Sequence, residues 1–311
     1  MPTPTISASA PGSLMLLGEH AVLHGHRALV AAVDQRIRVA LSPRNDRTIE
    51  IASALGQHRT ELENLEHHPR FQFVMEAIRR QAPTLPSGFS LQIESDFSHT
   101  IGFGSSAAVT VATVATLRAF AHTPPDPDAV REESIAIIRA VQGRGSGADV
   151  AASTHGGIVA YRAEPREVRV LNAQFDLCAV YSGYKTPTPE VIRRVEELWA
   201  DQPEALQHLY ALINENVETG IAALEANDLR ALGASLNAGQ LLMDRLGVNT
   251  PELAAIVDAL QADPGIHGAK ISGSGLGDCA IGLGALQAAH LPSPLIPVSI
   301  APAGLRIESP I

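Results

Sequence analysis

The stretch that decides the fold reads Ile101-Gly102-Phe103-Gly104-Ser105-Ser106-Ala107-Ala108, and it opens directly onto a long Ala/Val/Thr segment. We interpret residues 105–120 as a buried helix. Glycines let the backbone come close to a ligand, and the free N–H groups of a helix N-terminus favour an anion. The two serine hydroxyls are suited to hold a phosphate group or a magnesium ion. This pattern predicts a phosphate loop at residues 102–108.

Taken alone, the phosphate loop is compatible with other chemistry. The spacing within residues 102–107 satisfies a dinucleotide fingerprint, which would suit an NAD-binding oxidoreductase. Residues 104–108 resemble the nucleophile elbow of a serine hydrolase, in which Ser106 would need partners such as Asp149 and His267. A tight turn before a helix and an ATP-binding module without catalysis are further alternatives. Other segments have to decide between these functions.

A second segment near the start of the chain combines glycine with histidine. Residues 11–13 read Pro-Gly-Ser, and residues 18–25 read Gly-Glu-His-Ala-Val-Leu-His-Gly. His20 and His24 lie one helical turn apart, so a metal cluster is conceivable, but Glu19 is the only acid nearby and would face another side. We favour a substrate contact for His20 over metal binding and over plain packing.

Two further segments are rich in small residues. In residues 143–149, Asp149 is a single acid among glycines, which suits a catalytic base or a hydroxyl-orienting carboxylate. An aspartate that only caps a loop is the alternative. Residues 270–278 read Lys-Ile-Ser-Gly-Ser-Gly-Leu-Gly-Asp before an apolar strand. Because glycine loses much backbone entropy on folding, such a loop favours close approach to a ligand over an irregular hairpin.

The composition limits the class of protein. The chain has 311 residues, of which 45% are hydrophobic and 18% charged, enough for one large or two medium domains. A net charge of −10 argues against a broad surface for nucleic acid or anionic membrane. The two cysteines lie far apart, which predicts reduced, buried thiols. The first twelve residues carry no basic cluster or apolar run, so we expect no secretory signal and a cytoplasmic protein.

The hydrophobic pattern predicts strands interspersed with helices but without regular alternation, which is an α+β fold with a boundary near residues 170–185. Thr188 and Thr250, each followed by Pro and Glu, are typical helix N-caps. The other predicted helices cover residues 71–81 and 228–246. Strands are predicted at residues 36–41, 48–52, 91–94, 157–161, 168–171, 177–181 and 279–283, with an additional edge at 298–301 or 305–307.

The order of the glycine segments is more specific than any one of them. It resembles the GHMP kinases, the superfamily of galactokinase, homoserine kinase, mevalonate kinase and phosphomevalonate kinase, over residues 9–284. Within that superfamily, residues 18–25 look most like mevalonate kinases. Residues 146–157 agree, although they are also similar to phosphomevalonate kinases.

The resemblance implies a ribosomal-protein-S5-like N-terminal domain that binds ATP, residues 1–175, and a ferredoxin-like C-terminal domain, residues 176–311. It implies a cytoplasmic enzyme that uses ATP and Mg²⁺ to convert mevalonate to 5-phosphomevalonate in isoprenoid precursor synthesis. Its partner would be a small-molecule alcohol, not nucleic acid or membrane, and a homodimer is compatible with the sequence. Phosphomevalonate kinase, or a related kinase or decarboxylase acting on another mevalonate derivative, is the main alternative. A sugar or amino-acid kinase is a more distant one.

The resemblance also assigns roles to residues. Asp149 would face the acceptor hydroxyl, and Ser106, helped by Ser105, would reach the magnesium ion. The nucleotide would contact Gly102, Gly104, Ser105, Ser106, Ala107, Gly273, Ser274 and Gly275. The substrate would contact Glu19, His20, Gly147 and Thr186.

Two departures from mevalonate kinases stand out. Those enzymes usually have a lysine where this chain has Ser13, and a magnesium-binding glutamate where residues 137–142 have no acid. Lys185 follows a predicted strand and precedes a predicted helix, and only one other lysine, Lys270, occurs in the chain. We hypothesise that Lys185, helped by Arg144, replaces the missing catalytic lysine. A solvated lysine at a domain junction is the alternative.

Overall fold

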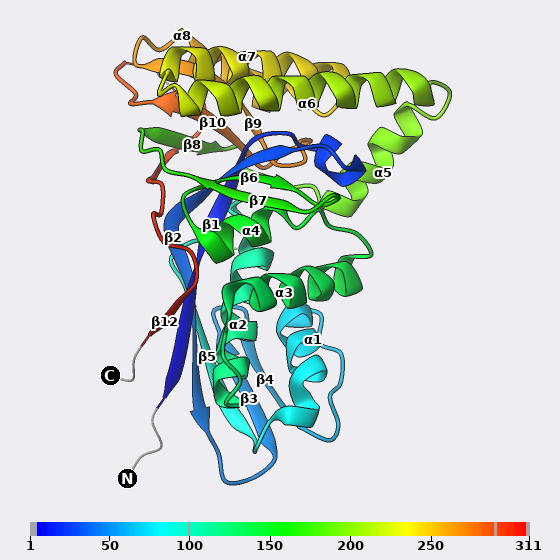
Figure 1. Cartoon of the computed structure of the whole chain (residues 1–311), viewed down its shortest axis with the longest axis vertical. Helices are drawn as coiled ribbons and strands as arrows, with labels where there is room; N and C mark the ends of the chain where they lie inside the picture. The colour runs from blue at the N-terminus through cyan, green and yellow to red at the C-terminus, as the bar shows by residue number, and fades with distance from the viewer. Residues whose placement is uncertain (1–4, 99, 289–290, 309–311) are drawn as a thin grey trace.

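The computed structural model describes residues 5–98, 100–288 and 291–308. Two β-sheets follow one another along the long axis, and each is covered by helices (Figure 1). The arrangement is the predicted α+β fold.

The first sheet has β12-β1-β2-β5-β3-β4 as its main strand order, and β6 pairs with both β2 and β7. Among the described strands of this sheet, β3 and β5 form the one parallel pair, and the other pairs are antiparallel. The strands are β1 (Ile6–Leu17), β2 (Ala28–Pro43), β3 (Thr48–Ser53), β4 (Gly56–Glu61), β5 (Phe89–Ser95), β6 (Ile158–Arg162), β7 (Glu167–Leu171) and β12 (Arg306–Glu308). A short 3-10 helix, Ala21–His24, connects β1 to β2.

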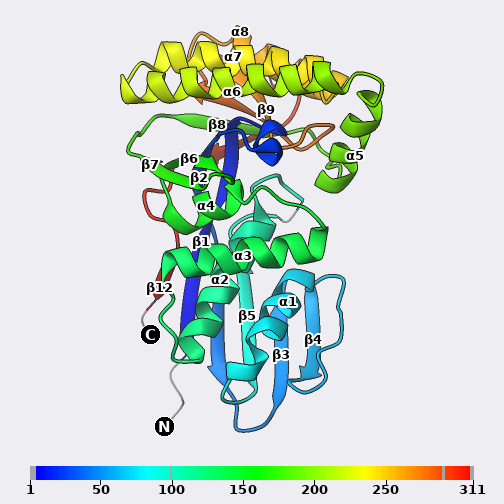
Figure 2. The same ribbon diagram turned by 45° about the vertical axis from the view of Figure 1, so that its right-hand side comes forward.

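The helix predicted after the phosphate loop is α2 (Ser105–Phe120), and it lies at the centre of the first half of the molecule (Figure 2). It contacts β1 and β2 as well as α1 (Gln72–Gln81), α3 (Pro127–Gln142) and α4 (Ala148–His155). Small and β-branched apolar residues occur on every side of α2, which is typical of a helix buried all round. A rigid element therefore carries the phosphate loop.

The second sheet has the antiparallel order β11-β8-β10-β9. Its strands are β8 (Leu177–Tyr181), β9 (Ile266–Ser272), β10 (Cys279–Gly284) and β11 (Leu295–Val298). Helices α6 (Pro203–Glu225), α7 (Leu229–Leu246) and α8 (Pro251–Ala262) stack above it, and α5 (Thr188–Leu198) lies at one side (Figure 1). The predicted cap at Thr250 is confirmed, because its side chain accepts the Leu253 N–H.

The structure corrects two expectations. At α5 the cap position is Pro187, so Thr188 is already helical and does not cap the helix. The predicted division between residues 175 and 176 falls between β7 and β8, where the chain passes from one sheet to the other. However, β12 pairs with β1, so the end of the chain lies with the N-terminal sheet. This pairing covers the edge of β1, which would otherwise expose unpaired backbone groups.

Two further properties follow from the packing. Cys178 and Cys279 are buried and unpaired with each other. Burial raises the pKa of Cys178 to about 11 and that of Cys279 to about 12, so both remain thiols near neutral pH. Within the described part of the chain, no helix is both long and apolar enough to cross a bilayer.

Candidate active site

Four segments that are distant in sequence meet around a cavity of about 180 Å³. The cavity lies where β1 and the N-termini of α2 and α4 face α5 and the loop between β9 and β10. The predicted site residues that line it are Glu19, His20, Gly102, Gly104, Ser105, Ser106, Ala107, Gly147, Asp149, Lys185, Gly273 and Ser274. Sequence reasoning therefore identified twelve residues of one cavity wall, fewer than half of the described residues that line it.

Two predicted residues, Gly275 and Thr186, are not among the described residues that line this cavity. They hold the loop in shape instead. The Thr186 hydroxyl donates to the Leu276 carbonyl at 2.5 Å. Gly275 has a φ of 85°, and a Cβ there would lie 2.6 Å from the Val248 carbonyl oxygen. The loop needs glycine at this position to pack closely on Val248.

The phosphate loop is joined to β1 at Ser13. The Ser13 N–H donates to the Phe103 carbonyl at 3.0 Å. Gly104 precedes α2 with a φ of 61°, and a Cβ there would lie only 2.1 Å from the Ser13 hydroxyl oxygen. Both the positive φ and the close approach require glycine. The N-terminus of α2, with the hydroxyls of Ser105 and Ser106, therefore faces the cavity at a fixed distance from β1.

Asp149 lies in the first turn of α4, at the cavity wall. The Ser13 hydroxyl donates to its Oδ1 at 2.7 Å. Burial raises the pKa of Asp149, while this hydrogen bond and the positive charge of Lys185 oppose the rise. An aspartate with a raised pKa and one oxygen already bonded is suited to orient a hydroxyl and to accept its proton.

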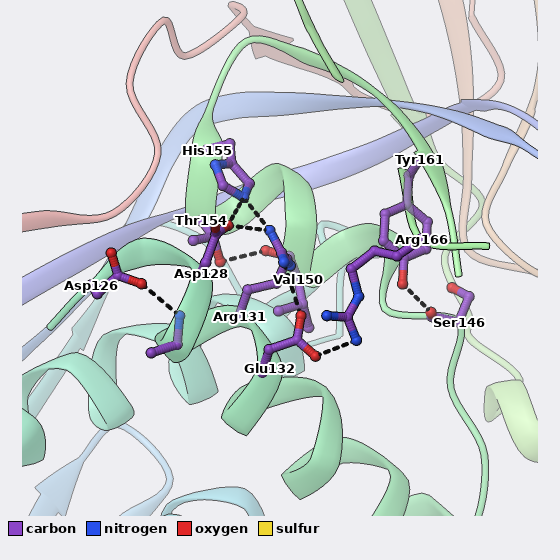
Figure 3. A network of polar contacts seen from close by, with 11 residues as sticks. Asp126, Asp128, Arg131, Glu132, Ser146, Val150, Thr154, His155, Tyr161 and Arg166 are labelled. Carbon is purple, nitrogen blue, oxygen red and sulfur yellow. Dashed lines mark hydrogen bonds and ion pairs between the residues drawn. The ribbon is translucent and has the colours of Figure 1, made fainter. Parts of the chain in front are cut away.

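Polar contacts fix α4 at both ends (Figure 3). At its start, the Tyr161 hydroxyl donates to the Ser146 carbonyl at 2.7 Å, and a Cβ at Gly147 would lie 2.6 Å from that hydroxyl. At its end, His155 Nε2 lies 3.0 Å from Arg131 Nη1. Because a guanidinium only donates, this imidazole nitrogen must accept. The network of Figure 3 extends to Asp128, Glu132 and Arg166. Asp149 thus has a rigid support.

His20 reaches from β1 to the loop of the second sheet. Its Nε2 lies 2.8 Å from the Ser274 carbonyl oxygen, so this nitrogen carries the proton. Burial lowers the pKa of His20, and that hydrogen bond opposes the shift. The lowered pKa favours a neutral ring. A neutral ring leaves Nδ1 as an acceptor. His20 also adopts a φ of 61°, a strained conformation that is concentrated at functional sites.

The metal hypothesis for the histidine segment has no support. No group of three potential His, Cys, Asp or Glu ligands occurs among the residues that the structure describes. His24 instead stacks on Tyr210 with ring centroids 4.4 Å apart. This histidine is explained by packing.

Glu19 faces the cavity but also forms a buried ion pair. Its carboxylate accepts from Lys270 Nζ, and the lysine is 1% exposed. Burial lowers the pKa of Lys270, and the Glu19 carboxylate opposes that shift. The pair links the end of β1 to β9, so it joins the two sheets beside the cavity.

We expect Lys270→Met to lower the free energy of unfolding more than the removal of any surface charge does. Breaking a buried pair by removing one partner typically lowers the free energy of unfolding by about 3–5 kcal/mol. Urea denaturation measures this, with Arg193→Met in the exposed Arg193–Glu197 pair as the control. A loss no larger than in that control would contradict a structural role, and Lys270→Met combined with Glu19→Gln should recover part of the loss.

Among the described residues that line the cavity, Lys185 and Arg144 are the lysine and arginine side chains, and each contacts an acid. Lys185 Nζ lies 3.3 Å from Asp278 Oδ2, and Arg144 Nη1 lies 2.8 Å from Glu196 Oε1 on α5. Lys185 is therefore a wall residue with an ion-pair partner, not a freely solvated lysine. Sequence reasoning did not assign a role to Asp278, although an acid directly after a glycine-rich loop was a visible signal.

Comparison with known proteins shows the family to which the chain belongs. The N-terminal domain of GHMP kinases matches residues 70–157 and their C-terminal domain matches residues 221–290. A galactokinase galactose-binding signature matches residues 2–43. The chain belongs to the GHMP kinase family.

Several of the similar proteins are mevalonate kinases. The enzyme of Archaeoglobus fulgidus is 34% identical over 281 residues, which cover 89% of this chain and 91% of the relative. That of Aeropyrum pernix is 29% identical, with coverage of 97% and 98%. The solved structure of L. major mevalonate kinase in complex with R-mevalonate has a TM-score of 0.78 and 23% identity, covering 98% of this chain and all of the other.

Proposed function

We propose that this protein transfers the γ-phosphoryl group of ATP to the primary hydroxyl of mevalonate and so forms 5-phosphomevalonate and ADP. The observation that carries the proposal is the Ser13–Asp149 contact, which places a carboxylate at the same cavity as the phosphate loop. The similarity to mevalonate kinases over most of the chain supports the choice of acceptor.

The site residues have complementary roles in this reaction. Backbone N–H groups at the start of α2 would bind the phosphates, as the positive end of a helix favours anions. Asp149 would orient the acceptor hydroxyl and take its proton as the oxygen attacks the γ-phosphorus. The bond to the β-phosphate oxygen breaks, and ADP leaves. His20 would accept a hydrogen bond from the substrate through Nδ1. Such transfer depends mainly on positioning and charge neutralisation.

The donor set at the cavity fits a nucleotide-bound magnesium ion. Mg²⁺ takes oxygen ligands and is typically held by one or two protein groups together with substrate phosphates. The hydroxyl of Ser106, with Ser105 beside it, would supply such a ligand. The buried hydroxyl of Ser272, which also lines the cavity, has no hydrogen-bond partner among the residues that the structure describes. When bound, the ion would neutralise phosphate charge.

The distribution of cations favours mevalonate over phosphomevalonate. Among the described residues that line the cavity, Arg144 and Lys185 are the only lysine or arginine side chains, and both already contact acids. A phosphorylated acceptor would bring its own phosphate group beside the triphosphate of ATP. The cavity would then need further positive charge to neutralise it. An acceptor without phosphate makes a smaller demand on these cations.

We expect Ser106→Ala to weaken the use of magnesium and ATP more than acceptor binding. Loss of the hydroxyl should raise the Mg²⁺ concentration for half-maximal rate on the order of tenfold, while the KM for the acceptor stays nearly constant. Initial rates in a magnesium titration measure this, and Ser105→Ala tests the neighbouring hydroxyl in the same way. Lost acceptor affinity with normal magnesium dependence would show that Ser106 is misplaced in the proposal.

ADP release with a panel of acceptors tests the function. The panel contains mevalonate, phosphomevalonate, homoserine and galactose, and Asp149→Asn controls for contaminating kinases. We expect mevalonate to give the highest kcat/KM. A preference for galactose would favour the sugar kinase that the match to residues 2–43 suggests, and a preference for phosphomevalonate would favour the main alternative.

A further inference from the structure

The acid after the late glycine loop, Asp278, is buried at the cavity and has an unusual environment. It is 7% exposed, and none of the described residues contacts its Oδ1 with ordinary hydrogen-bond geometry, although the Gly102 backbone N–H opposes the rise in its pKa that burial causes. Its backbone has a φ of 77°, in the region where residues other than glycine are uncommon. A desolvated carboxylate in such a conformation is unfavourable unless neighbouring groups compensate. Its position therefore calls for an explanation beyond packing.

The carboxylate of Asp278 lies directly against the phosphate loop. A Cβ at Gly102 would come within 1.9 Å of Asp278 Oδ1, so only glycine leaves room for this carboxylate. An acid at this distance from bound phosphates would repel them if it were uncompensated. The cation that contacts it is Lys185, whose Nζ lies 3.3 Å from Oδ2.

The backbone holds Asp278 and the segment of Lys185 in one register. The Asp278 N–H donates to the Tyr184 carbonyl at 2.8 Å, and the Ser182 N–H donates to the Asp278 carbonyl at 2.8 Å. The Thr186 hydroxyl adds a contact to the Leu276 carbonyl. These bonds fix where Lys185 leaves the backbone, but its long side chain remains 32% exposed and has many rotamers. The ion pair with Asp278 selects among them.

In the selected position, the Lys185 ammonium group can supply the positive charge that Ser13 cannot. The ammonium group of Lys185 acts electrostatically on both Asp149 and Asp278, and it lowers the pKa of each carboxyl against the effect of burial. Lys185 also lines the same cavity as Asp149 and Asp278. A positive charge at this position would stabilise the negative charge that develops during phosphoryl transfer.

We propose that Asp278 is a positioning residue that holds Lys185 over the phosphate loop, so that an ion pair from the second sheet replaces the cation missing at Ser13. The inference rests on the proposed phosphoryl transfer. It gives Asp278 no direct contact with the reacting atoms. Its effect on the reaction passes through Lys185.

A double-mutant cycle tests this inference. The four proteins are the unchanged chain, Asp278→Asn, Lys185→Met and the combination, and Glu197→Gln in the exposed Arg193–Glu197 pair is the control for a lost surface charge. We expect kcat to fall about tenfold or more in each single variant, and by less than about threefold further when Asp278→Asn is added to Lys185→Met, because residues that act as one unit are not additive. The Mg²⁺ concentration for half-maximal rate should change no more in Asp278→Asn than it does in Lys185→Met.

Three outcomes would overturn the inference. A full effect of Asp278→Asn in the Lys185→Met background would show that the acid acts by itself, for example on the magnesium ion. Near-normal kinetics of Lys185→Met, or of Asp278→Asn, would remove that residue from the mechanism. If Asp278→Asn does not fold, Asp278→Gly gives the same comparison, because glycine suits the positive φ.

A binding measurement separates this inference from the proposed function. Calorimetric titration of the same four proteins with a non-hydrolysable ATP analogue and Mg²⁺ needs no acceptor. If no acceptor is turned over, the proposed function fails, and non-additive losses of nucleotide affinity in the cycle would still support the positioning role. Additive losses would contradict it.

Discussion

Asp149→Asn is expected to lower kcat on the order of a hundredfold or more while nucleotide and acceptor still bind. The substitution keeps the shape of the side chain and its place next to Ser13, but it removes the charge that would orient the hydroxyl and accept its proton. Steady-state kinetics together with calorimetric titration of the nucleotide measure the two effects separately. Unchanged turnover in a folded variant would exclude Asp149 from the mechanism.

The pH profile gives a second test of Asp149. A base must be deprotonated, so kcat should fall as the pH drops through its pKa, which burial raises above the usual aspartate range. Ser13→Ala removes a hydrogen bond that lowers this pKa. The acid limb of the kcat profile should therefore move to higher pH in Ser13→Ala. An unmoved limb would indicate that another group titrates.

Gly104→Ala is expected to impair both stability and nucleotide binding. The new Cβ would lie 2.1 Å from the Ser13 hydroxyl oxygen, and the residue would have to keep a φ of 61°. The left-handed conformation and the overpacking together should lower the free energy of unfolding by about 2–4 kcal/mol. Displacement of the Ser13 hydroxyl would also disturb its contact with Asp149, so turnover should fall with nucleotide affinity.

Gly143→Ala is the matched control for this prediction. Gly143 also has a positive φ, 76°, but a Cβ there would meet no atom within 4 Å. It should therefore show only the conformational penalty, about 1–2 kcal/mol, with little change in nucleotide affinity. Urea denaturation and calorimetric titration compare the two variants. Equal behaviour of both would contradict the close packing of the phosphate loop on β1.

The sequence predicted the parts of the site that depend on local backbone chemistry. The glycines at residues 102 and 104 followed by an apolar segment define the phosphate loop and α2 without any tertiary information. Asp149 stood out because it is the single acid among small residues. Each of these signals lies within a few residues of the chain.

What the sequence did not reveal depends on contacts between distant segments. The contact between Ser13 and Asp149 joins β1 to α4, and the ion pair between Lys185 and Asp278 joins two connections of the second sheet. No local pattern specifies either pairing. An edge strand at residues 305–307 was one of two predicted alternatives, but its pairing with β1 was not predicted, because it joins the two ends of the chain.

Some regular elements were also missed. No helix was predicted for residues 203–225, which form α6, the longest described helix. Its N-cap residue, Gln202, makes no side-chain cap, although Pro203 and Glu204 follow it in the same pattern that predicted the helices after Thr188 and Thr250. The first strand, β1, contains Pro11 and Gly12, which read as loop residues. A shift of register between them accommodates both residues in the pairing with β2.

The central claim is that mevalonate, and not its phosphorylated derivative, receives the phosphoryl group. Phosphorus NMR of a reaction with mevalonate, ATP and Mg²⁺ tests it most directly, because the product signal identifies the group that carries the phosphate. We expect a new phosphomonoester signal, split by the neighbouring methylene protons, that grows with the ADP signals and is absent with Asp149→Asn. Absence of that signal, together with formation of a diphosphate ester when phosphomevalonate is supplied, would show that phosphomevalonate is the acceptor.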